Sequence, residues 1–161
     1  MTEPNYFAAA DYVEKARQEL MTYFKDFPFF KLMGIELVDI EPGRAVLAAT
    51  WRDDLCQPAG IMHGGVLASL VDTAIAQAIL LTPQHLAIRA QGGGMVTIDL
   101  RLKYLRPVSA GRVLCEARTV RVGRQIVLAT ATVTDAAGKE VALGDSTYML
   151  IAKEQLQKKG E

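Results

Sequence analysis

The 161-residue sequence has few of the residues that form disulfides or bind metal ions. It contains two cysteines, Cys56 and Cys115, and two histidines, His63 and His85. Two cysteines make no disulfide framework, so we expect a reducing, cytoplasmic location. No Cys or His lies at ligand spacing near either histidine, so we expect no metal site and no bound cofactor.

An excess of one charge and a long apolar run are also missing. Lys and Arg total 18, as do Asp and Glu, and the N-terminus M-T-E-P-N-Y-F lacks the pattern of a signal peptide. The longest apolar stretch, 66–81, is interrupted by polar residues and is too short for a bilayer about 30 Å thick. We therefore expect a buried helix there, and no nucleic acid or membrane as partner.

What the sequence does contain is enough apolar residues, 50%, for one core. Helical spacing predicts an amphipathic helix over 11–27, and E-P-G-R predicts a hairpin between strands at 35–40 and 45–51. Four further strands with short breaks are expected to form an antiparallel meander; they are 95–105, 113–122, 125–134 and 141–151.

These elements make an α+β domain in which one sheet curls about the long apolar helix. In the strand 95–105, apolar residues alternate with polar ones, which predicts one buried face. The apolar set is Val96, Ile98, Leu100, Leu102 and Tyr104.

Asp72 is the most informative residue of the chain, because no other formally charged side chain occurs between His63 and Gln84. A lone carboxylate in an apolar helix is costly to bury, so chemistry is one explanation for it. A structural carboxylate that accepts backbone hydrogen bonds is the other, and the residues alone leave both open.

Gly64 and Gly65 stand where the helical pattern begins. With no side chain in the way, the first backbone N–H groups are open to a ligand and favour negative charge, including the oxyanion formed when a thioester or ester carbonyl is attacked. These two residues are therefore a candidate oxyanion hole.

Gly65 and Asp72 lie on one face of this helix with small side chains between them, but about 10 Å apart along its axis. An oxyanion donor and a base must each come within roughly 3 Å of the reacting atoms. Two copies of the chain related by a two-fold axis would bring one glycine near the other copy's Asp72. The spacing thus predicts a dimer with shared sites.

The segments Q-P-A-G-I-M-H-G-G-V-L-A-S-L-V-D-T-A and M-V-T-I-D-L-R-L-K-Y-L-R-P-V resemble the hotdog-fold acyl-CoA thioesterases of the PaaI-like and medium- and long-chain types. The resemblance runs from about Phe29 to Ile151 and includes an acid nine residues after the His of H-G-G. It implies a hotdog fold and hydrolysis of a fatty-acyl or aryl-acyl CoA thioester, with coenzyme A as part of the substrate.

The resemblance also implies roles for single residues. Asp72 matches the catalytic acid, as nucleophile or general base, and Gly64 the amide that polarises the carbonyl. Gln57 stands where many members have Asn and would bind the carbonyl or the water. Thr97 matches a Ser or Thr that helps to place the water, and His63 mostly fixes the loop before Gly65.

Further implications concern assembly and domain limits. The family pairs two sheets into a homodimer, commonly a dimer of dimers, and acts in fatty acid metabolism. We divide the chain into an N-terminal helical extension (1–28), a hotdog thioesterase domain (29–152) and a solvated tail (153–161).

A basic patch for the phosphates of coenzyme A is a weaker prediction, since solvated strand faces explain the same residues equally well. Arg106, Gly123 and Arg124 are its best candidates; the others are Arg101, Lys103, Arg118 and Arg121.

Two other functions remain open on the residues alone. A hydratase or dehydratase of enoyl thioesters needs a His near the acid, and His63 is the candidate nearby in the sequence. A non-catalytic protein would use the same pocket to bind acyl-CoA. Cys56, next to Gln57, is expected to be a plain core thiol rather than a nucleophile.

Overall fold

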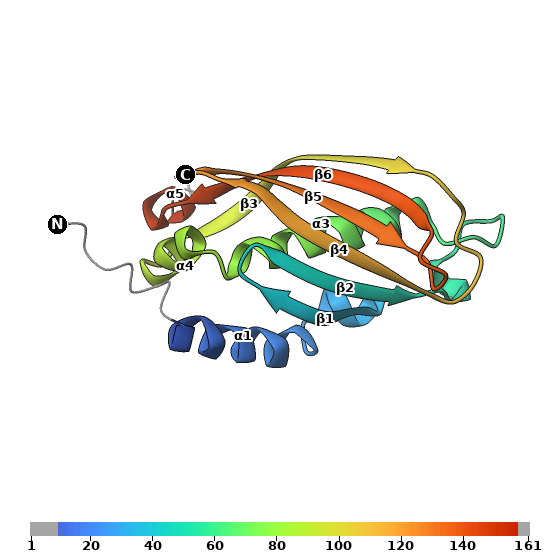
Figure 1. Cartoon of the computed structure of the whole chain (residues 1–161), viewed down its shortest axis with the longest axis horizontal. Helices are drawn as coiled ribbons and strands as arrows, with labels where there is room; N and C mark the ends of the chain where they lie inside the picture. The colour runs from blue at the N-terminus through green and yellow to red at the C-terminus, as the bar shows by residue number, and fades with distance from the viewer. Residues whose placement is uncertain (1–9, 158–161) are drawn as a thin grey trace.

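The computed structural model describes residues 10–157, and its elements follow one another as Figure 1 shows. The helices are α1 (Ala10–Phe24), α2 (Pro28–Met33), α3 (Gly64–Leu80), α4 (Pro83–Ala90) and α5 (Lys153–Gln157), with a 3₁₀ turn at Asp53–Leu55. The strands are β1 (Ile35–Glu41), β2 (Arg44–Thr50), β3 (Gly94–Tyr104), β4 (Arg112–Val122), β5 (Ile126–Thr134) and β6 (Glu140–Ile151).

Helix α3 is the centre of the core, and one antiparallel sheet of six strands curls around it (Figure 1). Its buried side chains, such as Leu70, Val71 and Ile75, are fully enclosed by the sheet. Between its end residues Gly64 and Leu80, which are also partly exposed, the positions of α3 that stay partly or fully exposed form one stripe along the helix: Gly65, Ala68, Ser69, Asp72 and Ala76. The α+β class and the sheet around a central helix are as expected, but one face of that helix is left open.

Among the described residues, no single helix is long and apolar enough to cross a membrane. Helices α3 and α4 pass that test only as a pair, with a bend of 80° between them.

The strand order is β1-β2-β4-β5-β6-β3, so the prediction of a four-strand meander is wrong. Short turns at 123–125 and 135–139 do join β4, β5 and β6 as hairpins, in line with the usual lengths of such loops. The longer segment 105–111 instead carries the chain away from β3, which pairs with β6 at the far edge. The break after β3 was therefore not a hairpin.

A β-bulge at Ile98 changes which side chains of β3 face α3. Thr97 pairs with Tyr148 and Asp99 with the next residue of β6, Thr147, so Ile98 has no partner across the ladder. The extra residue rotates the strand, and Thr97 joins Leu100 on the helix-facing side. Val96 and Ile98 are 38% and 53% exposed, so the prediction of one buried face is wrong for the first half of the strand. After the bulge, Leu100 and Leu102 pack against the core as predicted.

The N-terminal region forms two helices where one was predicted. Helix α1 ends at Phe24, and Pro28 is the first residue of α2. Phe27 before it has extended backbone angles, because a proline disfavours the helical conformation in the preceding residue. The rings of Phe24 and Phe30 stack at 4.2 Å between centroids and hold the two helices together.

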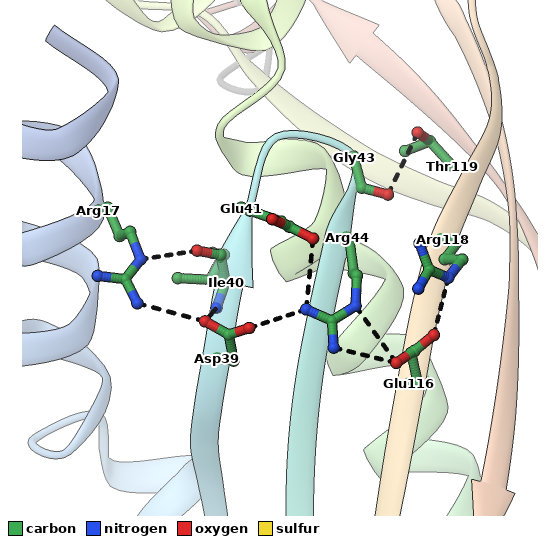
Figure 2. A network of polar contacts seen from close by, with 9 residues as sticks. All are labelled: Arg17, Asp39, Ile40, Glu41, Gly43, Arg44, Glu116, Arg118 and Thr119. Atoms are coloured by element: carbon green, nitrogen blue, oxygen red, sulfur yellow. Dashed lines mark hydrogen bonds and ion pairs between the residues drawn. The ribbon is translucent and has the colours of Figure 1, made fainter. Parts of the chain in front are cut away.

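A ladder of charged side chains fastens α1 to the sheet (Figure 2). Arg17 of α1 donates to the carboxylate of Asp39 and to the carbonyl of Ile40 on β1. Arg44 of β2 continues the ladder by donating to Asp39 at 2.8 Å and to Glu116 of β4 at 3.1 Å. The guanidinium of Arg44 beside Asp39 holds the pKa of that carboxyl below its ordinary value.

The division into extension, domain and tail stays a prediction. Residues 1–9 of the extension and 158–161 of the tail lie outside the described residues. The described part of the tail forms the short helix α5, whose residues 153–156 are exposed.

Candidate active site

The first turn of α3 presents a backbone donor without an acceptor. His63 caps the helix, and its Nδ1 accepts the N–H of Gly65 at 2.9 Å. The N–H of Gly64 has no acceptor among the residues that the structure describes. Two backbone N–H groups were expected to form an oxyanion hole. The N–H of Gly65 is already bonded to His63, whereas the N–H of Gly64 stays available for a ligand.

Both glycines have close neighbours. A Cβ on residue 64 would come within 3.2 Å of the Tyr104 ring, and one on residue 65 within 2.9 Å of Nδ1 of His63. The hydroxyl of Tyr104 donates to the carbonyl of Gly64 at 3.1 Å, so β3 closes over the beginning of the helix. The absence of side chains permits both contacts.

A cleft of about 380 Å³ opens beside this helix end. It collects four of the residues singled out from the sequence: Gln57, His63, Gly64 and Arg106. Leu67, Val108 and other apolar side chains form much of the remaining wall. Arg106 also donates to the carbonyl of Glu140 at 2.5 Å, which ties the segment after β3 to the start of β6.

Asp72 lies two turns further along α3, on the open stripe, and hydroxyl groups from two strands hold it. Thr97 donates to Oδ1 at 3.0 Å, and Tyr148 donates to the same oxygen at 2.6 Å. The Tyr148 hydroxyl also lies 2.9 Å from the carbonyl oxygen of Asp72. Oδ2 accepts no hydrogen bond within residues 10–157, so one carboxylate oxygen remains free.

The two groups do not meet within one chain. Eight residues separate Gly64 from Asp72 on the same helix, a rise of about 12 Å. The cleft at Gly64 is not lined by Asp72 or Thr97. A single chain therefore presents a free donor and a free carboxylate oxygen, too far apart to act on one carbonyl.

The candidate phosphate-binding residues are also divided. Gly123 and Arg124 line a separate depression at the turn between β4 and β5, next to Arg121. That turn is bonded to β6 near Tyr148, whereas Arg106 lines the cleft at Gly64. Arg101 and Arg118 are engaged with the neighbouring carboxylates of Asp145 and Glu116.

Other reactive side chains do not compete with this site. Partial burial raises the pKa of the Cys56 thiol, and nearby Asp53 adds to the effect, so the thiolate form is disfavoured. Burial raises the pKa of Cys115 to about 12. Residues 10–157 contain no group of three or more His, Cys, Asp or Glu that could hold a metal ion.

Sequence reasoning missed Tyr148 and the contact of Tyr104. A signal for Tyr148 existed, because every second residue of β6 from Ala142 to Leu150 faces the helix. Within that set the hydroxyl of a tyrosine requires a partner when buried, and Asp72 on α3 provides it. The contact of Tyr104 with Gly64 had no comparable signal.

Comparison with known proteins shows which family the chain belongs to. Residues 59–142 match the Thioesterase superfamily. The human acyl-coenzyme A thioesterase 13 is 26% identical over 140 residues, 85% of this chain and 95% of that protein. A relative from Saccharolobus solfataricus, 27% identical over 143 residues (88% of this chain and 95% of that protein), carries the broader name of an esterase.

Solved structures show the same fold. The PaaI protein of the phenylacetic acid degradation operon of E. coli superposes with a TM-score of 0.73 at 26% identity, covering 87% of this chain and 96% of that one. The hotdog fold expected from the sequence is confirmed. The matched segment contains Gly64, Asp72, Thr97 and Tyr104, and with it the chain belongs to the thioesterase superfamily.

Proposed function

We propose that this chain hydrolyses acyl-CoA thioesters to a free acid and coenzyme A, at sites that two copies of the chain build together. The observation that carries the proposal is the pair of unsatisfied groups on α3. The Gly64 N–H is free to donate to a developing oxyanion, and Oδ2 of Asp72 is free to act as base or nucleophile.

In the proposed reaction, the thioester carbonyl oxygen accepts the Gly64 N–H at the positive end of the helix. Asp72 of the other copy either removes a proton from the water that attacks the carbonyl carbon, or attacks that carbon itself to give a mixed anhydride that water then hydrolyses to the free acid. Gln57, in the wall of the cleft, holds the carbonyl or that water. The coenzyme A thiolate is a good leaving group, so the site needs no separate general acid.

The surface of the single chain supports the assembly of two copies. The edge strand β3 exposes Val96 and Ile98, and the stripe of α3 beside it is uncovered. An exposed apolar edge strand is unfavourable in isolation, and pairing with a second copy would cover it. We propose a homodimer with shared sites, and its further pairing into a dimer of dimers.

Substrate contacts follow from the same arrangement. Arg106 lies in the cleft and Arg124 beside Gly123 in the second depression, where cations suit the phosphates of coenzyme A. His63 and Gly65 would support the donor loop. The two free cysteines fit a cytoplasmic enzyme, and fatty acid metabolism is the proposed setting.

The test is release of free thiol from acyl-CoAs that range from acetyl through aryl-acetyl to palmitoyl. We expect release from at least one fatty-acyl or aryl-acyl CoA, and slower cleavage of the matching oxygen esters because an alkoxide leaves less readily. No thiol release across the series would overturn the proposal.

The same assay separates the rival activities. A hydratase would consume the double bond of an enoyl-CoA without releasing thiol. His63 is poorly suited to that reaction, because its Nδ1 already accepts the Gly65 N–H. A protein that only binds acyl-CoA would show saturable binding and no turnover.

A further inference from the structure

Tyr148 is the buried partner of the proposed reactive carboxylate. It faces α3 from β6, is 3% exposed and pairs across the ladder with Thr97 of β3. On the same face of β6, Gly144 lets α3 approach closely, since a Cβ there would lie 2.5 Å from Val71. The tyrosine is thus buried between β6 and α3.

Two hydroxyl groups converge on a single oxygen of Asp72. Tyr148 and Thr97 both donate to Oδ1, at 2.6 and 3.0 Å, and none of the described residues donates to Oδ2. Within residues 10–157, the buried side-chain nitrogen and oxygen atoms that lack a partner are Trp51 Nε1 and Gln77 Oε1, so the unbonded Oδ2 is not buried. The two donors therefore fix the rotation of the carboxylate and leave Oδ2 facing accessible space.

The bulge in β3 also helps to place Thr97. In a regular strand, with Ile98 paired across the ladder, Thr97 and Asp99 would lie on the same face, so the bulge is what lets Thr97 face the helix while Asp99 faces away from it. Burial, reinforced by Asp72, raises the pKa of the Tyr148 phenol, so its proton remains on the ring oxygen as a donor. A hydroxyl with one proton favours the charged acceptor over the backbone carbonyl of Asp72.

We propose that Tyr148 is a positioning residue that acts through Asp72: together with Thr97 it binds Oδ1 and presents Oδ2 as the reacting oxygen. The inference rests on the proposed thioesterase function. Tyr148 touches no substrate, so its removal changes the rate of the chemical step and not the binding of acyl-CoA.

Tyr148→Phe tests this role because it keeps the buried ring and removes only the donor. We expect kcat on the best acyl-CoA to fall roughly ten- to a hundredfold, the usual scale for one hydrogen bond to a charged group, with KM changed less than about twofold. Tyr23→Phe is the matched control, because Tyr23 is 61% exposed and lies on α1. It is expected to leave both constants unchanged.

A double-mutant cycle distinguishes positioning from a general structural role. In the background of Asp72→Asn, Tyr148→Phe is expected to cause no further loss of the residual rate. Losses that multiply would mean that Tyr148 acts independently of Asp72, and the proposal would fail. Thr97→Ser should keep most of the activity, whereas Thr97→Val should slow turnover by roughly tenfold, since only serine retains the second donor.

A spectroscopic test needs no turnover. A hydrogen bond of 2.6 Å to a carboxylate should give a downfield hydroxyl proton signal in the NMR spectrum that vanishes in Tyr148→Phe and shifts in Asp72→Asn. If Tyr148→Phe does not fold, the wild-type spectrum still provides a test. A hydroxyl signal that is absent from the wild type, or unchanged in Asp72→Asn, would overturn the positioning role.

The outcomes separate the two proposals. A wild-type protein that releases no thiol from any acyl-CoA overturns the proposed function, and with it the role of Tyr148. An active wild type that Asp72→Asn inactivates, but Tyr148→Phe leaves unchanged in kcat, overturns only the positioning role.

Discussion

Strand β3 contacts two polar groups of α3, Gly64 at the beginning of the helix and Asp72 two turns later, and the two contacts have opposite consequences. At the beginning of the helix, Tyr104 of β3 donates to the carbonyl of Gly64 and leaves the Gly64 N–H free. Two turns later, Thr97 of β3 donates to Oδ1 of Asp72 and leaves Oδ2 free. One end thus offers a donor and the other an acceptor.

The free donor of Gly64 and the free oxygen of Asp72 also differ in how far they are exposed to solvent. The donor end lies in a cleft partly walled by apolar side chains, where a hydrogen bond to an oxyanion is strengthened by exclusion of water. Asp72 lies on the open stripe, where its charge remains solvated in the single chain. A second copy that covered the stripe would exclude water from Asp72 and place its free oxygen near the Gly64 N–H of that copy.

The largest expected effect is at the acceptor end. Asp72→Asn removes the base or nucleophile and keeps the size of the side chain, so kcat on the best acyl-CoA should fall at least about a hundredfold, within the range of roughly 10²–10⁴ for general-base catalysis. Substrate should still bind, as measured by titration with a non-hydrolysable acyl-CoA analogue. Turnover close to that of the wild type would show that the carboxylate is structural.

The next effect tests whether the two ends cooperate across copies. Gly64→Pro removes the donor, and proline suits the first helical position because His63 before it is already extended. Mixed with Asp72→Asn, it should restore about a quarter of wild-type activity. About half of randomly paired dimers would be mixed, and each of these would have one intact site of two.

This experiment needs a folding control, because residue 64 packs against the ring of Tyr104. Circular dichroism and sedimentation must first show that Gly64→Pro folds and assembles like the wild type. Verified mixed dimers that remain as inactive as their parents would mean that both groups act within one chain, against the separation of about 12 Å along α3.

A smaller effect separates positioning from reaction. Gln57→Ala and Thr97→Ala should each slow turnover by roughly tenfold, because each removes one hydrogen bond and leaves the reacting groups in place. Steady-state kinetics beside Asp72→Asn measures the ratio. If either variant folds and is as inactive as Asp72→Asn, the proposed division of roles is incorrect.

The elements with strong local signals were predicted well. The apolar run that became α3, the hairpin of β1 and β2, and the α+β class follow from residue periodicity and from the turn residues Pro42 and Gly43. Gln57, His63, Gly64 and Arg106 were singled out from the sequence and line one cleft. Asp72 was singled out because a charge in an apolar helix is rare, and its catalytic role stays a prediction.

The features that were missed depend on contacts between distant segments. No local pattern states that β3 pairs with β6 rather than β4, since that choice is made by the packing of the whole sheet around α3. The bulge at Ile98 has no residue signature either, because Ile is an ordinary strand residue. Because of this bulge, the alternation of apolar and polar residues in β3 does not show which side chains face α3. The bulge also turns Thr97 toward Asp72.

The smallest effect is expected in the charged ladder that fastens α1 to β1, which takes no part in the proposed reaction (Figure 2). Asp39 joins Arg17 and Arg44 there, but its side chain is 42% exposed, so water screens the contacts. Asp39→Asn should therefore lower the free energy of unfolding by no more than about 1 kcal/mol and leave kcat unchanged. Asp26→Asn is the matched control, because Asp26 forms one exposed ion pair with Lys31.

The pH dependence of this effect has a definite sign. Arg44 lowers the pKa of Asp39 in the folded chain, so the ionised carboxylate stabilises the fold above its ordinary pKa of about 4. That stabilisation is lost as the pH falls through the lowered value, where the carboxylate gains a proton in both states. Urea unfolding should thus separate wild type from Asp39→Asn at pH 7, and the difference should shrink steadily as the pH falls below about 4. A difference that grows on acidification would mean that Asp39 stabilises α1 in its protonated form, and that the ladder is not held by charge.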